Sequence, residues 1–557
     1  MKTKYILLLF ILIGFTACND EEDFVDPVID VNLPALTAGS ADFSNYVAVG
    51  ASFTAGFTDN ALFIAGQQNS FPNILSGRFA LAGGGNFNQP LMNDNVGGFL
   101  FGGMPLFDAN GNRLFGPRLF FDGEGPVTLP AESSTEATTV LTGPFNNIGV
   151  PGTKSFHLAV SGYGALNPYF GRMASNPAAT IIGDALAQNP TFFTISEIGG
   201  NDVLFYALAG GDAVDQTGNL NPLTYGLNDI TDPNVFAAAF SATVDALVAN
   251  GAKGVVGNVP YITSMSHFTT VPHNPLDPTD EAFGPQIPTL NLIYGALNEI
   301  FIAFGETNRV IVFSEDDPES EDDFSALVIK DETLDDFSGT ITGILANSPE
   351  FAALIGQFGL PPAAAPTVAN ILGQLYGQCR QATADDLFVL PSSSVIGELN
   401  LENIGTIVPQ LMAIGVPLSS AQQLAGQFSV EGITFPLEDK WCLIPSEQNS
   451  IRVATDAYNE TIAAVANAND LAIVDLKNIL IEASTMGYPS NNFILTTDLV
   501  TGGAIGLDGV HLTSRGYAAM ANAILRAIDE KYGSNFEASG NLVDVGDYPT
   551  NYPPSLQ

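Results

Sequence analysis

The fold of this chain is decided by residues 46–56, which read Tyr-Val-Ala-Val-Gly-Ala-Ser-Phe-Thr-Ala-Gly. The first five residues form a short apolar run that a glycine stops, a pattern typical of a strand buried in a parallel sheet. Ser52 stands just beyond the expected strand, where Gly50 lets the chain turn sharply. The sequence therefore predicts a buried strand that delivers a serine hydroxyl to one edge of a sheet.

Three more apolar runs of the same kind follow, at residues 191–196, 253–260 and 471–475. Helical periodicity marks residues 451–468 and 514–530. Strands that alternate with helical segments predict an α/β fold with a mostly parallel central sheet and helices on both faces. In such sheets functional sites gather at the carboxyl ends of the strands.

Two other short stretches carry polar groups suited to ester chemistry. Asn201 follows two glycines just after a predicted strand, and its side-chain amide is a neutral donor for an oxyanion; taken alone, this stretch is also typical of a turn with a helix cap. Asp508 and His511 lie three residues apart, so one loop can present a base and the carboxylate that orients it. Because a serine hydroxyl needs such a base, the pattern indicates a serine hydrolase.

These stretches resemble the GDSL, or SGNH, hydrolase family, whose blocks occur here in the family's order: residues 50–56, 147–152, 199–202 and 508–511. The resemblance covers the sheet-forming parts of the chain. It implies a three-layer α/β/α sandwich, with Ser52 as nucleophile and Asp508 and His511 as its acid and base. It also implies an oxyanion hole made by Ser52, Gly152 and Asn201, and it implies neither a cofactor nor a metal.

Two residues depart from the family pattern: Ala51 replaces the usual aspartate and Phe53 the usual leucine, which removes a supporting contact but leaves the nucleophile. The order Ser, Asp, His also occurs in α/β-hydrolases. Those enzymes use a Gly-x-Ser-x-Gly elbow and separate the acid widely from the base, whereas here Thr54 interrupts the elbow pattern. The other three histidines lack a comparable acidic partner and are expected to be structural: His157, His267 and His273.

The N-terminus has the pattern of an export signal. Residues 5–15 are apolar but too few to span a bilayer, and they lead into Phe-Thr-Ala-Cys, which resembles a bacterial lipobox. The resemblance implies a signal peptide at residues 1–17 and a lipid on Cys18 that anchors the protein to a membrane. An ordinary secretory signal is the alternative. The acidic run at residues 19–23 resembles the export signal of Bacteroidetes-type outer-membrane lipoproteins exposed at the cell surface.

The remaining chain divides into an acidic tether at residues 18–45, a hydrolase domain at 46–532 and a loosely ordered tail at 533–557. The domain must carry large insertions, near residues 60–144 and 315–445. We expect the first to form long loops with a small β-rich flap and the second to form three or four short helices as a cap. The acidic run that begins the second insertion is expected to be a solvated loop, with a calcium site as the alternative.

Composition restricts the partners. The chain has 557 residues, of which 46% are hydrophobic, so it can bury a large core. Its 59 acidic and 17 basic residues give a net charge of −42, which repels nucleic acid and anionic membrane surfaces.

In an oxidising envelope Cys379 and Cys442 are expected to form a disulfide, and they are a poor metal site.

The expected substrate is an ester, and its class stays open at this point. The apolar insertions favour a lipid or another fatty acyl ester, with an acetylated glycan as the rival because the resembling family includes such esterases. A surface binding lipoprotein on an inactive hydrolase scaffold is the alternative outside catalysis.

Overall fold

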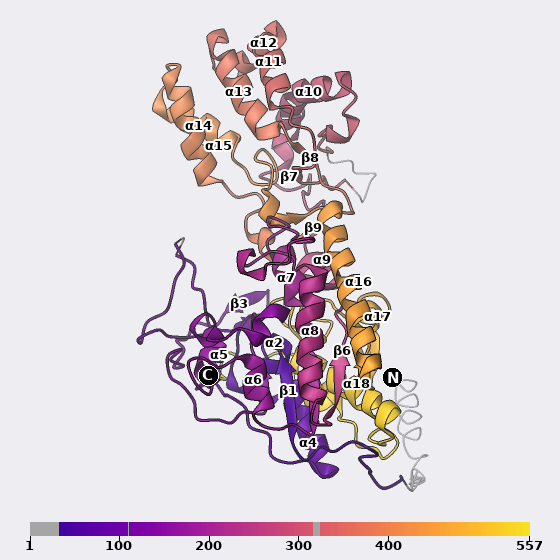
Figure 1. Ribbon diagram of the computed structural model, residues 1–557. Helices are drawn as coiled ribbons and strands as arrows, with labels where there is room; N and C mark the ends of the chain where they lie inside the picture. Colours follow the sequence, from indigo (N-terminus) through magenta and orange to yellow (C-terminus); the bar gives the residue numbers. More distant parts are fainter. Residues whose placement is uncertain (1–32, 110, 316–322) are drawn as a thin grey trace, which may run out of the picture.

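The computed structural model describes residues 33–109, 111–315 and 323–557 (Figure 1). The predicted signal peptide, the predicted lipid attachment site at Cys18 and most of the acidic run after residue 315 lie outside these ranges. Within them, no helix combines the length and the apolar character needed to cross a membrane.

The centre of the molecule is a parallel sheet of five strands in the order β11-β6-β5-β1-β4. Its strands are β1 (Tyr46–Gly50), β4 (Asn147–Gly149), β5 (Phe192–Ser196), β6 (Lys253–Gly257) and β11 (Ala472–Val474). The predicted α/β class with a mostly parallel sheet is confirmed, as are the four predicted strands. The edge strand β4 was not predicted as a strand, because three residues are too few to show a periodic pattern.

Helices cover both faces of this sheet, because successive side chains of each strand point to opposite faces. Val47 and Val49 belong to one apolar core, whereas Tyr46 and Ala48 belong to another. The first core is covered by α8 (Pro233–Val248) and α16 (Pro445–Ala468), the second by α4 (Phe71–Leu81) and α18 (Ser514–Tyr532). The amphipathic segments predicted at residues 451–468 and 514–530 are therefore helices that pack on the sheet.

A helical lobe stands apart from the sheet, at the top of Figure 1. It has its own apolar core, separate from the two cores at the sheet. Its helices are α10 (Ile287–Ala303), α11 (Ser338–Leu345), α12 (Pro349–Gln357), α13 (Ala365–Tyr376), α14 (Leu401–Ala413) and α15 (Leu418–Gln427). The second insertion thus contributes five of these helices, α11 to α15, where three or four were expected.

The predicted disulfide is wrong. Cys379 lies in β8 (Cys379–Gln381), which pairs with β7 (Val328–Lys330), whereas Cys442 lies in β10 (Cys442–Leu443), which pairs with β9 (Leu387–Phe388). Both are free thiols buried in the apolar core of the helical lobe. Burial raises the pKa of Cys379 to about 12, so this thiol stays protonated and unreactive.

Three segments that were expected to be a tether, long loops and a loose tail contain residues that pack into the fold. Within the expected tether, the buried Phe43 ring stacks on Phe79 at a centroid distance of 4.1 Å. Phe79 itself belongs to α4, a core helix inside the expected loop insertion. The expected loose tail is held by the buried Arg118, which donates hydrogen bonds to the carbonyl groups of Tyr552, Pro553 and Leu556.

Candidate functional site

Ser52 begins α2 (Ser52–Ala55) just after strand β1, which lies between β5 and β4 in the sheet. The β1–α2 turn is tight: a Cβ on Gly50 would lie only 2.0 Å from the hydroxyl oxygen of Thr54, so this position requires glycine. Ser52 is largely buried, with 7% of its surface exposed. The serine therefore stands where the sequence predicts it, at the carboxyl end of a middle strand.

Glu197 holds the β1–α2 turn in place through hydrogen bonds. The sequence pattern does not predict this role. One of its carboxyl oxygens accepts hydrogen bonds from the backbone N–H groups of Ala51 (2.6 Å) and Thr54 (2.9 Å), and the other accepts from the Thr54 hydroxyl (3.1 Å). Its backbone φ of 50° is unusual for a residue other than glycine. Burial raises the pKa of Glu197 to about 7 despite these hydrogen bonds.

Asn201 is the first residue of α7 (Asn201–Leu208), which follows strand β5. Its side-chain amide donates one hydrogen bond to the carbonyl group of Thr153 (2.9 Å), which fixes the orientation of the amide. An amide group has two N–H donors, so one remains for a ligand. Gly199, just before it, has a φ of 107° and approaches Val259 and Phe236 too closely for any side chain.

Gly152 lies in the loop after β4 and has a φ of 79°, which favours glycine. A Cβ here would have no neighbour closer than 3.8 Å, so open space lies beside its backbone. The same loop is tied to α7: the backbone N–H and hydroxyl of Ser155 donate to the buried carboxylate of Asp202 at 2.9 and 2.7 Å. Gly152 and Asn201 are therefore held on adjoining, mutually bonded elements.

Asp508 and His511 lie in the loop before α18 and form the predicted pair. His511 Nδ1 lies 2.9 Å from Asp508 Oδ2. Because a carboxylate only accepts, Nδ1 carries the proton and Nε2 is left as the basic nitrogen. Burial acts to raise the pKa of Asp508, but the charge and side chain of His511 and hydrogen bonds from the backbone N–H groups of Val510 and His511 outweigh it and lower the pKa to about 2. The backbone N–H of Asn60 also donates to this carboxylate.

One open cleft of about 680 Å³ brings the predicted residues together. Its lining includes all five of them: Ser52, Gly152, Asn201, Asp508 and His511. The first insertion also reaches it, through residues 112–117 and Thr128. Of residues 315 and 323–445, which the structure describes, none lines this cleft, so the helical lobe is not confirmed as its cap.

His157 and His267, expected to be structural, also line this cleft, whereas His273 does not. His267 Nδ1 lies 3.1 Å from the carbonyl oxygen of Asp508 and donates to it, and the backbone N–H of His267 donates to Gly509. His157 Nδ1 accepts from the backbone N–H of Lys154, and burial lowers the pKa of His157 to about 4, so it is neutral at pH 7. The one feature of the sequence that indicates a place for His157 near the cleft is that it follows Gly152 by five residues.

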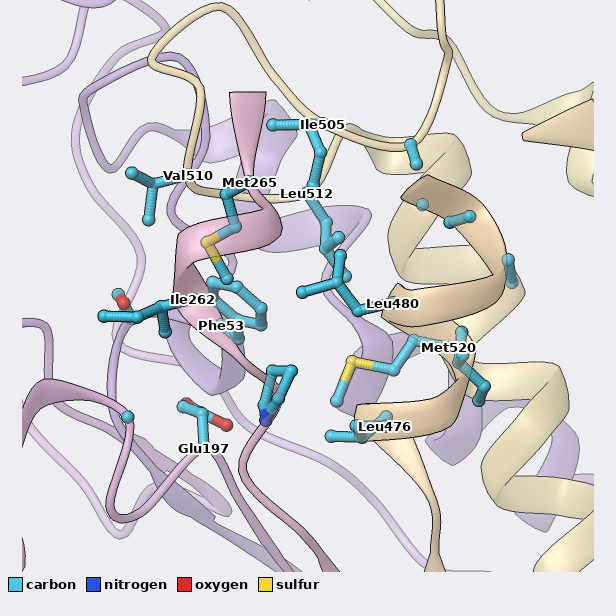
Figure 2. Close-up of a pocket in the computed structure, with 18 of the residues that line it drawn as sticks. Phe53, Glu197, Ile262, Met265, Leu476, Leu480, Ile505, Val510, Leu512 and Met520 are labelled. Carbon is cyan, nitrogen blue, oxygen red and sulfur yellow. The ribbon is translucent and has the colours of Figure 1, made fainter. Parts of the chain in front are cut away.

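A second, apolar pocket of about 110 Å³ adjoins the same serine (Figure 2). Ser52 and Asn201 line both cavities, whereas His511 lines only the cleft. In Figure 2 the apolar side chains converge on a common space, with Glu197 at one end. The labelled apolar residues are Phe53, Ile262, Met265, Leu476, Leu480, Ile505, Val510, Leu512 and Met520. They come from segments more than 400 residues apart, so no local pattern predicts this pocket.

Within the described residues, one cluster of three acidic side chains could hold a cation: Glu332, Asp439 and Glu447. None of the three lines the cleft or the apolar pocket. The expectation that the site needs no metal or cofactor stays a prediction.

Comparisons with protein-family models, with curated proteins and with solved structures found no match to this chain.

Proposed function

We propose that this protein is a serine hydrolase of carboxylic esters. The observation that carries the proposal is the gathering of Ser52, the paired Asp508 and His511, and the donors of Gly152 and Asn201 around one cleft. A hydrolase needs a nucleophile, an oriented base and oxyanion donors within reach of one reacting carbon. Each has a candidate here, on a helix or loop that follows a strand or precedes a helix of the sheet domain.

In the proposed reaction, His511 Nε2 takes the proton of Ser52 as the hydroxyl oxygen attacks the ester carbonyl. The oxyanion accepts hydrogen bonds from the backbone N–H groups of Ser52 and Gly152 and from the free amide N–H of Asn201. His511 then gives its proton to the leaving alcohol. Water, activated by the same base, releases the acyl group from Ser52.

Two further sets of observations support the proposed family of the protein and its proposed location in the cell. The four sequence blocks and the helices on both sheet faces favour a three-layer SGNH-type sandwich. The lipobox pattern at Cys18 and the acidic run after it favour an outer-membrane lipoprotein at the cell surface. Both assignments are part of the proposal.

The first test replaces Ser52 with alanine in the protein lacking residues 1–18. We expect turnover of p-nitrophenyl butyrate to fall by about a thousandfold or more, because no other group can form the acyl-enzyme. The wild type should also be labelled covalently by a fluorophosphonate probe, and Ser52→Ala should not.

Ser44→Ala is the matched control, because Ser44 is exposed and lies two residues before the start of the same strand, at the end far from Ser52. Unchanged turnover in folded Ser52→Ala would contradict the proposal. A wild type that neither turns over the ester nor reacts with the probe would favour a binding lipoprotein on a hydrolase scaffold.

An esterase for acetylated carbohydrate is the second candidate. It is favoured by the polar and aromatic side chains in the open cleft, which suit a sugar alcohol: Asn60, Asn112, Arg113, Asn167 and Tyr169. Release of acetate from acetylated xylan, with no turnover of longer acyl esters, would support this candidate.

A further inference from the structure

We propose that the apolar pocket beside Ser52 binds the acyl chain of the substrate and that its size selects a chain of about six carbons. This inference rests on the proposed ester hydrolysis and assigns the substrate class within it.

The direction of the acyl chain follows from where the base lies. His511 must reach the leaving alcohol oxygen, and His511 lines the open cleft but not the apolar pocket. The alcohol and the attacking water therefore occupy the cleft. The acyl chain, on the other side of the carbonyl carbon, points towards the cavity that Ser52 and Asn201 share with the cleft.

The lining of the pocket selects an apolar chain. Ile262, Met265 and Met520 are buried side chains that border it, and Phe53 and Leu480 pack among them (Figure 2). The carboxyl oxygens of Glu197, at one end, already accept hydrogen bonds from the β1–α2 turn. Because a buried polar group without a partner is costly, a hydroxylated or charged acyl group would bind poorly.

The volume sets the length. A dry apolar protein cavity of about 150 Å³ accommodates benzene, a molecule of six carbons. The present pocket, at about 110 Å³, is of similar size. An acetyl group would leave most of it empty, whereas a long fatty chain would exceed it.

The first experiment compares kcat/KM for p-nitrophenyl acetate, butyrate, hexanoate, octanoate and laurate. Each methylene that enters the pocket should raise kcat/KM about fourfold, the equivalent of about 0.8 kcal/mol. We expect a maximum near hexanoate and a fall at laurate. A maximum at acetate, or a continued rise to laurate, would overturn the inference.

A pair of neighbouring residues on α18 tests the pocket itself. Ala519→Leu adds carbons to the lining and should lower the ratio of hexanoate to acetate turnover at least fourfold. Met520→Ala enlarges the pocket and should move the maximum towards octanoate. Each ratio is measured within one protein preparation, so a lower folded fraction cancels, and mere destabilisation would not shift the two variants in opposite directions.

Leu227→Ala is the matched truncation in the open cleft, where Leu227 is exposed. It should leave the chain-length ratios unchanged. If Leu227→Ala shifts them and both α18 variants do not, the acyl chain lies in the cleft and the inference is wrong. A wild type without turnover or fluorophosphonate labelling would instead remove the proposed function itself.

Discussion

The protonation state of Glu197 depends on burial, which raises the pKa of its carboxyl group. Its carboxyl group is enclosed beneath the β1–α2 turn, and three hydrogen bonds from Ala51 and Thr54 hold that turn in place. A side chain distant in sequence thus supports the nucleophile.

Replacing Glu197 with glutamine should change how stability depends on pH. The pKa of Glu197 is raised from 4.5 to about 7 in the folded protein, so between these values the unfolded chain releases a proton that the folded protein retains. The free energy of unfolding should therefore fall as pH rises from 4.5 to 7, by about 3 kcal/mol for this group. Glu197→Gln should remove that part of the slope.

Urea unfolding of both proteins at pH 4.5, 5.5 and 7 measures this difference. Glutamine can accept from the same backbone N–H groups and donate to the Thr54 hydroxyl, so the turn should persist. Asp59 also has a pKa raised by burial to about 7, but it is present in both proteins and cancels in the comparison. Parallel pH profiles for the two proteins would show that Glu197 is ionised when folded.

At the scale of elements, the site depends on a bond between two segments that follow different strands. Asp202, in the first turn of α7, accepts both donors of Ser155 from the loop after β4. This contact couples the positions of Asn201 and Gly152. Asn201 directly precedes Asp202, and Gly152 lies three residues before Ser155. This buried interaction and the hydrogen bond from Asn201 to Thr153 therefore place two of the three proposed oxyanion donors relative to each other.

Asp202→Ala should separate the loop from the helix. It leaves the backbone N–H and hydroxyl of Ser155 without a buried acceptor, and we expect a loss of about 3 kcal/mol of stability together with a lower kcat. Asp202→Asn is the matched control, because an asparagine can accept from the N–H and donate to the hydroxyl. Urea unfolding and ester turnover measure both effects; equal stability of the alanine and asparagine variants would contradict this role.

At the scale of the whole molecule, the final residues stabilise the site from a distance. Arg118 is fully buried and donates to three carbonyl groups in the last six residues. The next residue, Leu119, donates its N–H to the carbonyl group of Asp59, and the N–H of Asn60 donates to Asp508. The tail, the first insertion and the acid of the site thus form one bonded network.

Removal of residues 550–557 should destabilise the protein by about 3–5 kcal/mol, because the buried guanidinium of Arg118 loses three of its five carbonyl acceptors. Thermal unfolding measures the effect. Removal of Gln557 alone is the control, since the carbonyl groups of Tyr552 and Pro553 remain and Leu556 still presents an oxygen to Arg118, now in the terminal carboxylate. A truncated protein with the midpoint of the wild type would show that these contacts add no stability.

The local sequence pattern was enough to predict much of the fold and of the candidate site. The strand at residues 46–50 was predictable because a buried parallel strand is a continuous apolar run, and Ser52 and Asn201 because they directly follow such runs. Asp508 and His511 were predictable as a pair because a short loop brings them together. The segment at residues 33–45 and the C-terminal tail were not, because their order comes from Phe43, Arg118 and Tyr552 packing against distant parts.

The sequence by itself therefore determined the α/β class, four of the five strands and the candidate catalytic residues, since each depends on neighbours along the chain. Only the tertiary structure decided that Glu197 lies beneath Ser52, that His267 contacts Asp508 and that an apolar pocket adjoins the nucleophile. It also decided that the two buried thiols stay apart and that the helical lobe lies away from the cleft. These features depend on side chains from distant segments packing together, and such contacts leave no periodic trace in the sequence.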